Sequence, residues 1–251
     1  MRPLEGRTAL VTGSGRNIGR AIALQFAHAG ANVIVNGHRD RNALEDVAAE
    51  IGALGREAIA VVADVGNPRE IQRMVKIAEK KVGPIDIAVS NAAVRREQGF
   101  LEMSTSDWHS VLSTNLYSAF YLGRTVLPGM RERRWGRIIH ISGEDGFGAQ
   151  HYRRAHVTVA KAGIHALSKA IAIEFGAYGI TANTISPGSV DTIRDWSRYP
   201  KGWRQKRVKP IPLGRVASVD DVAAACLYLA GDAGSYITGQ VIHVNGGRFM
   251  Y

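Results

Sequence analysis

Short apolar runs alternate with longer segments of helical periodicity along most of the 251-residue chain. The apolar runs cover residues 8–13, 31–37, 58–65, 86–92, 136–142, 180–186 and 239–245. Most of them are continuous rather than alternating, which is typical of strands buried on both faces. Between the runs, apolar residues recur every three or four positions, as at Ile164, Leu167 and Ile171, which indicates helices. This order predicts an α/β fold with a doubly wound, seven-stranded parallel sheet and helices on both faces.

The composition limits the class of protein. No Pro-rich or Ser-rich linker divides the chain, so we expect a single domain over 1–251. No apolar run approaches the ~18 residues that span a bilayer, and the first residues lack the pattern of a signal peptide. We therefore expect a cytoplasmic protein that does not contact a membrane.

Cysteine and histidine give no sign of a metal centre. The single cysteine, Cys226, lies in an apolar stretch and excludes a disulfide framework and a cysteine-based metal site. The eight histidines lack the helical spacing, with a neighbouring acid, that marks a zinc site. We expect no metal.

A glycine-rich loop joins the first expected strand to the first expected helix. Gly13, Gly15 and Gly19 lie in this loop. Glycines there allow a tight turn and a close approach of the backbone to a pyrophosphate, while the helix N-terminus favours negative charge. The loop predicts a dinucleotide site of the Rossmann type.

With the loop in this position, the chain resembles the short-chain dehydrogenase/reductase family from about residue 5 to 247, and within it the 3-oxoacyl-acyl-carrier-protein reductases. The family's TGxxxGxG loop is matched by residues 12–19, with Asn17 in place of the middle glycine. Asparagine tolerates left-handed backbone better than other non-glycine residues, so the difference is mild. The resemblance and the charge pattern together imply these cofactor-binding residues: Gly13, Ser14, Gly15, Arg16, Asn17, Ile18, Gly19, His38, Arg39, Asp64, Val65, Asn91, Ala92, Ala93, Lys161, Pro187, Gly188 and Val190.

Charge near the second strand indicates which nicotinamide cofactor is preferred. Users of NAD in this fold place an acid near the end of that strand, where this chain has Gly37. Arg16 and Arg39 lie near the same place and suit a 2′-phosphate. We expect NADP(H) to be preferred, with NAD as the other possibility; ordinary surface arginines are the alternative explanation.

The resemblance implies an active site with Asn, Ser, Tyr and Lys, of which only two are matched directly. Asn115 and Lys161 stand at the asparagine and lysine positions, but the tyrosine position, one helical turn before Lys161, holds Val157. Gly143 occupies the serine position. Ser142 precedes it, and because successive side chains of a strand alternate faces, its hydroxyl is expected to point away from the site unless the strand twists there.

Three residues are the main candidates for the missing proton donor; a fourth, Tyr152, stands nine residues before Lys161 and about half a turn out of phase with it. Glu144 and Asp145 follow Gly143 in a loop that lines the substrate pocket in this fold, and burial can raise a carboxyl pKa toward neutrality. His156 neighbours Val157 and has a suitable ordinary pKa, although it points about 100° away around the helix. Each of the three also has an ordinary structural explanation, as a solvated loop acid or a packed histidine.

Three functions remain open. The first is an oxidoreductase that uses NADPH on a carbonyl or hydroxyl substrate with an atypical proton source. The second is a binding or regulatory module that keeps the cofactor and has lost turnover. The third is a lyase or epimerase activity that uses Glu144 or Asp145.

The +10 net charge is spread widely, with one concentration at 194–210. This segment matches the family's substrate lid, at about 190–215, and holds seven Lys or Arg residues against one acid. It suits an anionic or carrier-bound small-molecule substrate, or is simply a solubilising loop. Interleaved aromatic residues leave single-stranded nucleic acid as a weak alternative, and we expect no nucleic-acid partner. The family resemblance implies a homo-oligomer, either a tetramer or a dimer.

Overall fold

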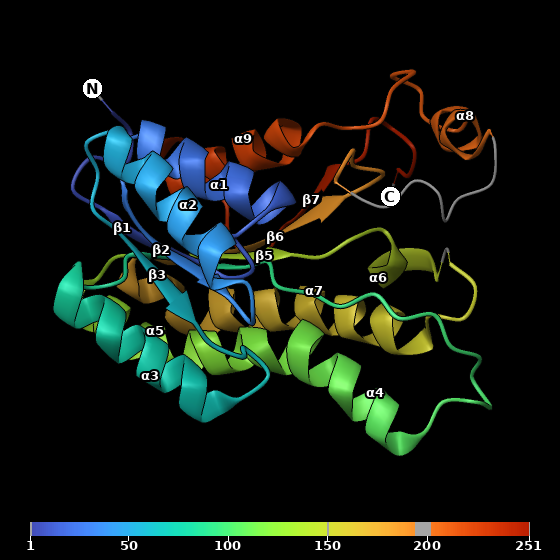
Figure 1. The fold of residues 1–251 in the computed structure, drawn as a ribbon, viewed down its shortest axis with the longest axis horizontal. Coiled ribbons are helices and arrows are strands. Elements are labelled where there is room, and N and C mark those ends of the chain that lie inside the picture. Colours follow the sequence, from blue (N-terminus) through green and yellow to red (C-terminus); the bar gives the residue numbers. More distant parts are fainter. Residues whose placement is uncertain (1, 150, 194–201, 251) are drawn as a thin grey trace.

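The computed structural model describes residues 2–149, 151–193 and 202–250. A seven-stranded sheet runs through its centre in the order β3-β2-β1-β4-β5-β6-β7, with every neighbouring pair parallel (Figure 1). The strands are β1 (Thr8–Val11), β2 (Asn32–Gly37), β3 (Ala58–Val62), β4 (Ile87–Ser90), β5 (Gly136–Ile141), β6 (Ile180–Pro187) and β7 (Val241–Val244). The expected doubly wound parallel sheet is confirmed. Because all strands run in one direction, the loops that follow them gather at one edge of the sheet.

Helices cover both faces of the sheet (Figure 1). One layer holds α1 (Asn17–His28), α2 (Arg41–Ala53) and α9 (Val219–Ala230), and the opposite layer holds α3 (Pro68–Lys81), α5 (Ser118–Arg133) and α7 (Ala155–Phe175). Shorter elements complete the described chain: α4 (Thr105–Leu112), η1 (Ser113–Tyr117), α6 (Asp145–Gly148), η2 (Gly176–Tyr178), α8 (Trp203–Val208) and η4 (Asp232–Gly234). Two apolar cores, one on each face, join these layers to the sheet.

Six of the seven strands are shorter than the apolar runs that predicted them, and β6 extends one residue beyond its run. β3 ends at Val62, although the run continues to 65, because Ala63 to Val65 turn toward α3. β7 covers only four residues of the run 239–245. The runs therefore located each strand correctly and overestimated the length of all but β6.

Local sequence explains where several helices begin. Ser218 and Asp221 form a capping box at the start of α9, and Asn67 caps α3 one residue before Pro68. Arg16 precedes α1 and makes no side-chain cap, so the first N–H groups of α1 are left for another acceptor. The N-terminus of α1, unlike those of α2 and α9, therefore lacks a side-chain cap where it meets the glycine loop.

Two further features matter below. Cys226 lies fully buried on the inner face of α9, and burial raises the pKa of its thiol. Within the residues described here, no helix is long and apolar enough to cross a membrane.

Candidate active site

The glycine loop between β1 and α1 is packed too tightly for side chains at two of its glycines. A Cβ atom on Gly19 would lie 2.3 Å from the Gly13 carbonyl oxygen, and one on Gly13 would lie 2.9 Å from the Ala92 Cα atom. Gly13 and Asn17 adopt left-handed backbone, with φ of 64° and 53°. Asn17 thus fulfils the conformational role expected of it in place of glycine.

Side chains from two strands hold this loop in place. The Thr12 hydroxyl accepts hydrogen bonds from the backbone N–H groups of Asn91 (2.9 Å) and Ala92 (3.1 Å). The Asn91 amide donates to the carbonyls of Thr12 and Gly13. Ser14 is fully buried and donates to the Val11 carbonyl, so its hydroxyl supports the turn itself. The loops after β1 and β4 therefore form one rigid unit.

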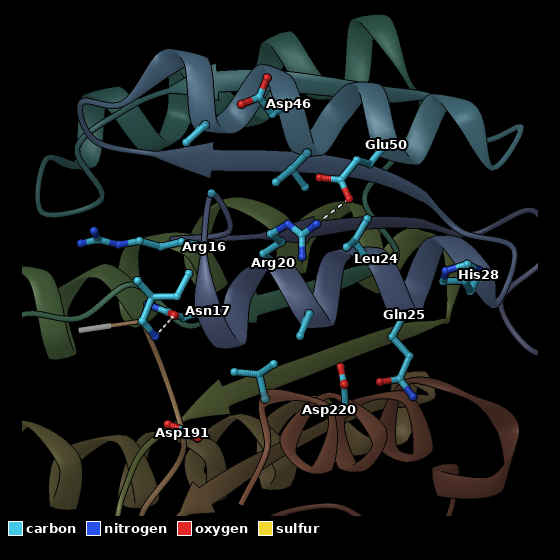
Figure 2. Close-up of a pocket in the computed structure, with 16 residues that line it drawn as sticks. Arg16, Asn17, Arg20, Leu24, Gln25, His28, Asp46, Glu50, Asp191 and Asp220 are labelled. Carbon is cyan, nitrogen blue, oxygen red and sulfur yellow. Dashed lines mark hydrogen bonds and ion pairs between the residues drawn. The ribbon is translucent and has the colours of Figure 1, made fainter. Parts of the chain in front are cut away.

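A groove of about 750 Å³ opens beside the loop and follows α1 between α2 and α9 (Figure 2). Gly15, Arg16 and Asn17 lie at its start. Arg20 pairs with Glu50 across it at 2.5 Å. The groove therefore begins at the uncapped N-terminal end of α1.

The end of β2 carries the groups expected to select the cofactor. Arg16 and Arg39 are exposed, and in the described part of the chain neither guanidinium has an ion pair. The His38 Nε2 atom lies 3.8 Å from the Asp64 Oδ2 atom, while Oδ1 of Asp64 accepts from the Gly66 N–H and fixes the turn that contains Val65. Positive charge is thus available at the position where an acid would bind ribose hydroxyls.

Asn115 lies in η1, a π-helical turn that joins α4 to α5. It is 2% exposed, and its amide makes two hydrogen bonds of 2.8 Å with the Val94 backbone, donating to the carbonyl and accepting from the N–H. Single π-helical turns are frequent at functional sites. Asn115 here fixes the chain that leaves β4, on which Ala92 and Ala93 also lie.

Lys161 is buried on α7 and donates from Nζ to the Ile141 carbonyl at 2.8 Å. Burial and, to a smaller extent, the charge of Arg95 lower its pKa to about 7, against the opposing charge of Asp145. Its ammonium therefore lies at the carboxyl end of β5, among charged groups that also come from the loops after β4 and β5.

The positions expected for the tyrosine and the serine carry no hydroxyl. Val157 is 2% exposed and stands one turn before Lys161 on α7. A Cβ atom on Gly143 would find only the Pro187 carbonyl oxygen, at 3.9 Å, within 4 Å. Ser142 is buried, and its hydroxyl lies 2.7 Å from the His165 Nε2 atom, on the side of α7. Space is therefore open at Gly143, whereas Ser142 is already paired.

Glu144 is buried against the loop that follows β6. Its Oε2 atom lies 3.3 Å from Arg248 Nη1, and its Oε1 atom has no hydrogen-bond partner among the described residues. A Cβ atom on Gly188 would lie 3.1 Å from this Oε1. Burial raises the pKa of Glu144, against the opposing effects of Arg248 and Asn245.

Asp145 behaves in the opposite way although it is the next residue. Its carboxylate lies 2.5 Å from the His151 Nδ1 atom, and its side chain is 12% exposed. Burial alone would raise the pKa of Asp145, but the hydrogen bond and charge of His151, with the charges of Arg154 and Arg95, lower it overall. Two adjacent carboxyls with pKa values pushed apart are a frequent property of acid–base sites.

His156 lies apart from this cluster. It is fully buried, and its Nδ1 atom accepts from the Val157 N–H at 3.0 Å. Burial lowers its pKa, and the charged residues that act on it are Arg96 and Asp107, near α4. The structure thus places Glu144, Asp145 and Lys161 together and His156 on another side of α7.

The chain after β6 returns to the glycine loop. Pro187 ends β6, Val190 forms a parallel bridge with Ala217, and the Ile193 N–H donates to the Asn17 Oδ1 atom at 2.8 Å. Of the basic segment expected at 194–210, residues 194–201 lie outside the described residues.

Sequence reasoning missed three cationic residues that contribute to the site: Arg95, His151 and Arg248. Arg248 comes from the C-terminal end and also donates to the Ser189 hydroxyl at 3.1 Å. None of the three belongs to a spacing motif. The accumulation of Arg and His at 95–96 and 151–154 was the one signal that the sequence offered.

Comparisons with known proteins agree with this architecture. Residues 13–248 match the family model described as enoyl-(acyl carrier protein) reductase. The chain is 35% identical to 3-oxoacyl-acyl-carrier-protein reductase of Pseudomonas aeruginosa (98% of this chain, 99% of the relative). It is 39% identical to acetoacetyl-CoA reductase of Allochromatium vinosum, again over 98% and 99% of the two chains.

A solved structure from Sinorhizobium meliloti, described as a short-chain alcohol dehydrogenase, superposes with a TM-score of 0.92 at 30% identity. The superposition covers 98% of this chain and 97% of that one. With the glycine loop, the parallel sheet and these matches over nearly the whole length, the chain belongs to the short-chain dehydrogenase/reductase family of oxidoreductases.

Proposed function

We propose that the protein uses NADPH to reduce a carbonyl group, or NADP⁺ to oxidise the corresponding alcohol, at a site without the usual tyrosine. One observation carries the choice of cofactor: the uncapped N-terminus of α1 lies beside two exposed arginines, Arg16 and Arg39, that have no ion pair in the described part of the chain. Phosphate groups bind helix N-termini and arginines through charge-assisted hydrogen bonds.

The residues present fit such a dinucleotide. The uncapped first turn of α1 would hold the pyrophosphate, Asp64 and Val65 would contact the adenine, and residues 91–93 would line the site beyond it. Pro187, Gly188 and Val190, at the end of β6 and just after it, would flank the nicotinamide. When bound, the nicotinamide supplies or accepts the hydride.

Lys161 and Asn115 prepare the reacting end of the site. Lys161 is proposed to bind the ribose of the nicotinamide, for which its Nζ must leave the Ile141 carbonyl. Asn115 is proposed to hold the segment after β4 in its productive position through its two bonds to Val94.

The substrate class follows from the relatives and from charge. The two curated relatives are named for the reduction of a 3-oxoacyl-acyl-carrier-protein and of acetoacetyl-CoA. We propose a 3-oxoacyl thioester or a similar anionic carbonyl compound, attracted by the basic segment of a lid at about 190–215.

We make two further proposals, one on domain organisation and one on oligomeric state. The whole chain, 1–251, is proposed to act as a single cofactor-binding and catalytic domain. A dimer or tetramer is also proposed, because the apolar side chains of Phe120 and Ile173 are 47% and 88% exposed on neighbouring helices α5 and α7.

A second candidate function is a cofactor-binding module without turnover. The specific observation in its favour is that Val157 and Gly143 present no hydroxyl near Lys161. A lyase or epimerase activity is a third candidate, favoured by the buried Glu144 Oε1 atom without a partner in the described chain.

Titration of the protein with NADPH and NADH, followed by fluorescence, tests the cofactor assignment. We expect NADPH to bind at least ~10-fold more tightly, and Arg39→Ala or Arg16→Ala to remove most of that difference, since a charge-assisted hydrogen bond contributes about 1.5–3 kcal/mol. Arg131→Ala, on α5 at the opposite face of the sheet, is the control. Equal affinities for the two cofactors in the parent would contradict the assignment.

Oxidation of NADPH over a panel of ketones, aldehydes and 3-oxoacyl thioesters separates the functions. Turnover of any member supports the reductase. Tight NADPH binding without turnover of any member would support the binding module instead.

A further inference from the structure

We propose that Asp145 and His151 form the proton-transfer pair of the site, with His151 touching the substrate oxygen and Asp145 orienting it. This proposal rests on the proposed reduction of a carbonyl. His151 would take over the chemical task for which the chain has no tyrosine hydroxyl, from a different segment and a different side of the pocket.

The pair has the geometry of an oriented general acid. Asp145 Oδ1 and His151 Nδ1 are 2.5 Å apart, while the side chains are 12% and 33% exposed. An ionised carboxylate only accepts hydrogen bonds, so Nδ1 carries the donated proton and Nε2 is the nitrogen left to exchange one. The carboxylate is thus shielded while the imidazole remains accessible.

The pair lies within the cluster that surrounds Lys161. Asp145 opens α6, two residues after Gly143, and its charge acts on the Lys161 ammonium. The charge of His151 in turn acts on Glu144, which packs against Gly188 in the loop expected to flank the nicotinamide. Through its contact with Asp145, His151 therefore belongs to the same group of ionisable side chains as Lys161 and Glu144.

The backbone that carries His151 is held in an uncommon conformation. Ala149 and Arg153, on either side of it, are non-glycine residues with positive φ, at 43° and 62°. Such conformations are costly for non-glycine residues and persist where the surroundings enforce them. Strain of this kind is concentrated at functional sites.

Three contacts enforce the conformation. The Arg153 carbonyl accepts from the Gln98 N–H at 2.8 Å, Arg153 pairs with Glu102 at 2.6 Å, and Arg154 pairs with Glu97. All three partners lie on the segment after β4. The His151 segment is therefore tied to the loop that also holds the cofactor-binding and Asn115 contacts, which a solvated surface ion pair would not require.

The proposed step balances without a further reactant. A bound NADPH would supply a hydride to the carbonyl carbon, and the electron pair of the C=O π bond would move to oxygen. The oxygen takes the proton from Nε2 of the His151 imidazolium, which leaves neutral imidazole hydrogen-bonded to Asp145. A proton taken up from the solvent then restores Nε2–H, so each turnover consumes one NADPH and one proton.

Turnover and cofactor binding, measured together on a carbonyl that the parent reduces, test the assignment. We expect His151→Ala and His151→Gln to lower kcat by ~10²-fold or more, within the range of general acid catalysis, with the Kd for NADPH changed less than about twofold. His109→Ala, an exposed histidine on α4, is the control and should match the parent. A thermal melt shows that each variant is folded.

Asp145→Asn supplies a readout that a structural ion pair would not give. Loss of the carboxylate removes the acceptor that orients the His151 ring, so kcat should fall while KM changes little, and Asp145→Glu, which keeps a carboxylate, should recover part of the loss. Glu144, Arg95, Arg154 and Lys161 face the same cluster and remain unchanged in this variant.

The outcomes distinguish the two levels of the proposal. Turnover that is indifferent to both His151 substitutions would overturn the pair and leave the reductase standing. A parent that binds NADPH but reduces no carbonyl would overturn the reductase and the pair with it. A loss of kcat that is equal in His109→Ala would also overturn the pair.

Discussion

The cofactor half and the substrate half of the site are built in opposite ways. Around the glycine loop, a methyl group on Gly19 would lie 2.3 Å from a carbonyl oxygen, whereas one on Gly143 would meet nothing closer than 3.9 Å. The first region consists of backbone in close contact, whereas Gly143 in the second has room for a side chain and is followed by the ionisable residues Glu144 and Asp145. Where the backbone is closely packed, only glycine fits. Where there is room beside ionisable side chains, several different residues can be accommodated. We therefore expect changes in chemistry to have entered through the second region.

The sharpest test of this comparison restores the missing hydroxyls. Gly143→Ser combined with Val157→Tyr should raise carbonyl reduction by ~10²-fold or more, because general acid catalysis typically contributes 10²–10⁴-fold. Gly143 has room for the serine; Val157 is buried, so the phenol must displace its neighbours. Single and double variants are compared by the rate of NADPH oxidation. If the double variant is folded and binds NADPH but reduces carbonyls no faster than the parent, the absence of the two hydroxyls is not what limits the activity of this region.

The same substitution in both halves tests the difference in packing directly. Gly19→Ala should lower the free energy of unfolding by about 3 kcal/mol, since its methyl group meets backbone that cannot move freely. Gly143→Ala should change it by less than about 1 kcal/mol. Urea denaturation of the two variants measures both values. Similar losses of unfolding free energy at Gly19 and Gly143 would contradict the proposed difference in packing.

Lys161 lies where the two halves meet, and it should show opposite effects on binding and stability. Lys161→Met should weaken NADPH binding about 10-fold by removing the ribose contact. Because burial lowers the pKa of Lys161 to about 7, the ammonium form destabilises the fold at acid pH and the parent gains stability as pH rises through and above 7. The variant should therefore be more stable than the parent at pH 6, by about 1–2 kcal/mol, and lose this advantage by pH 9. Unfolding curves at the two pH values decide the matter.

The smallest expected effect concerns Glu144. Its pKa is raised, so its contribution to stability is complete below the ordinary glutamate pKa and declines as pH rises through the raised value. Glu144→Gln should flatten that decline and leave NADPH binding within a factor of about 2 of the parent, because the carboxyl contacts Arg248 rather than the glycine loop. Melting temperatures from pH 4 to 8 for parent and variant measure it. If the melting temperature changed with pH in the same way in the parent and in Glu144→Gln, a residue other than Glu144 would be responsible for the decline.

The comparison also explains how far the sequence could predict the structure. The seven strands, the glycine loop and the conformation at Asn17 follow from local patterns: apolar runs, glycine spacing and the tolerance of asparagine for left-handed backbone. The ends of β3 and β7 were overestimated, because an apolar residue such as Val65 packs equally well after the chain has left the sheet. The pairing of Asp145 with His151 had no such pattern, since it depends on how the chain folds back between α6 and α7. His156, which the sequence placed beside Val157, lies near the charges of Arg96 and Asp107, and only the packing of α4 against α7 reveals this.

The buried thiol on α9 has a practical consequence for following motion in solution. Cys226 is the only cysteine among the 251 residues, it is 0% exposed, and burial raises its pKa, so it scarcely forms the reactive thiolate at neutral pH. A cysteine introduced on the surface, for example at Ile193 beside Asn17, is therefore the one that a maleimide dye labels in the folded protein. The native cysteine therefore does not have to be removed first. The fluorescence of a dye at position 193 would report whether the surroundings of this residue change when a dinucleotide is added.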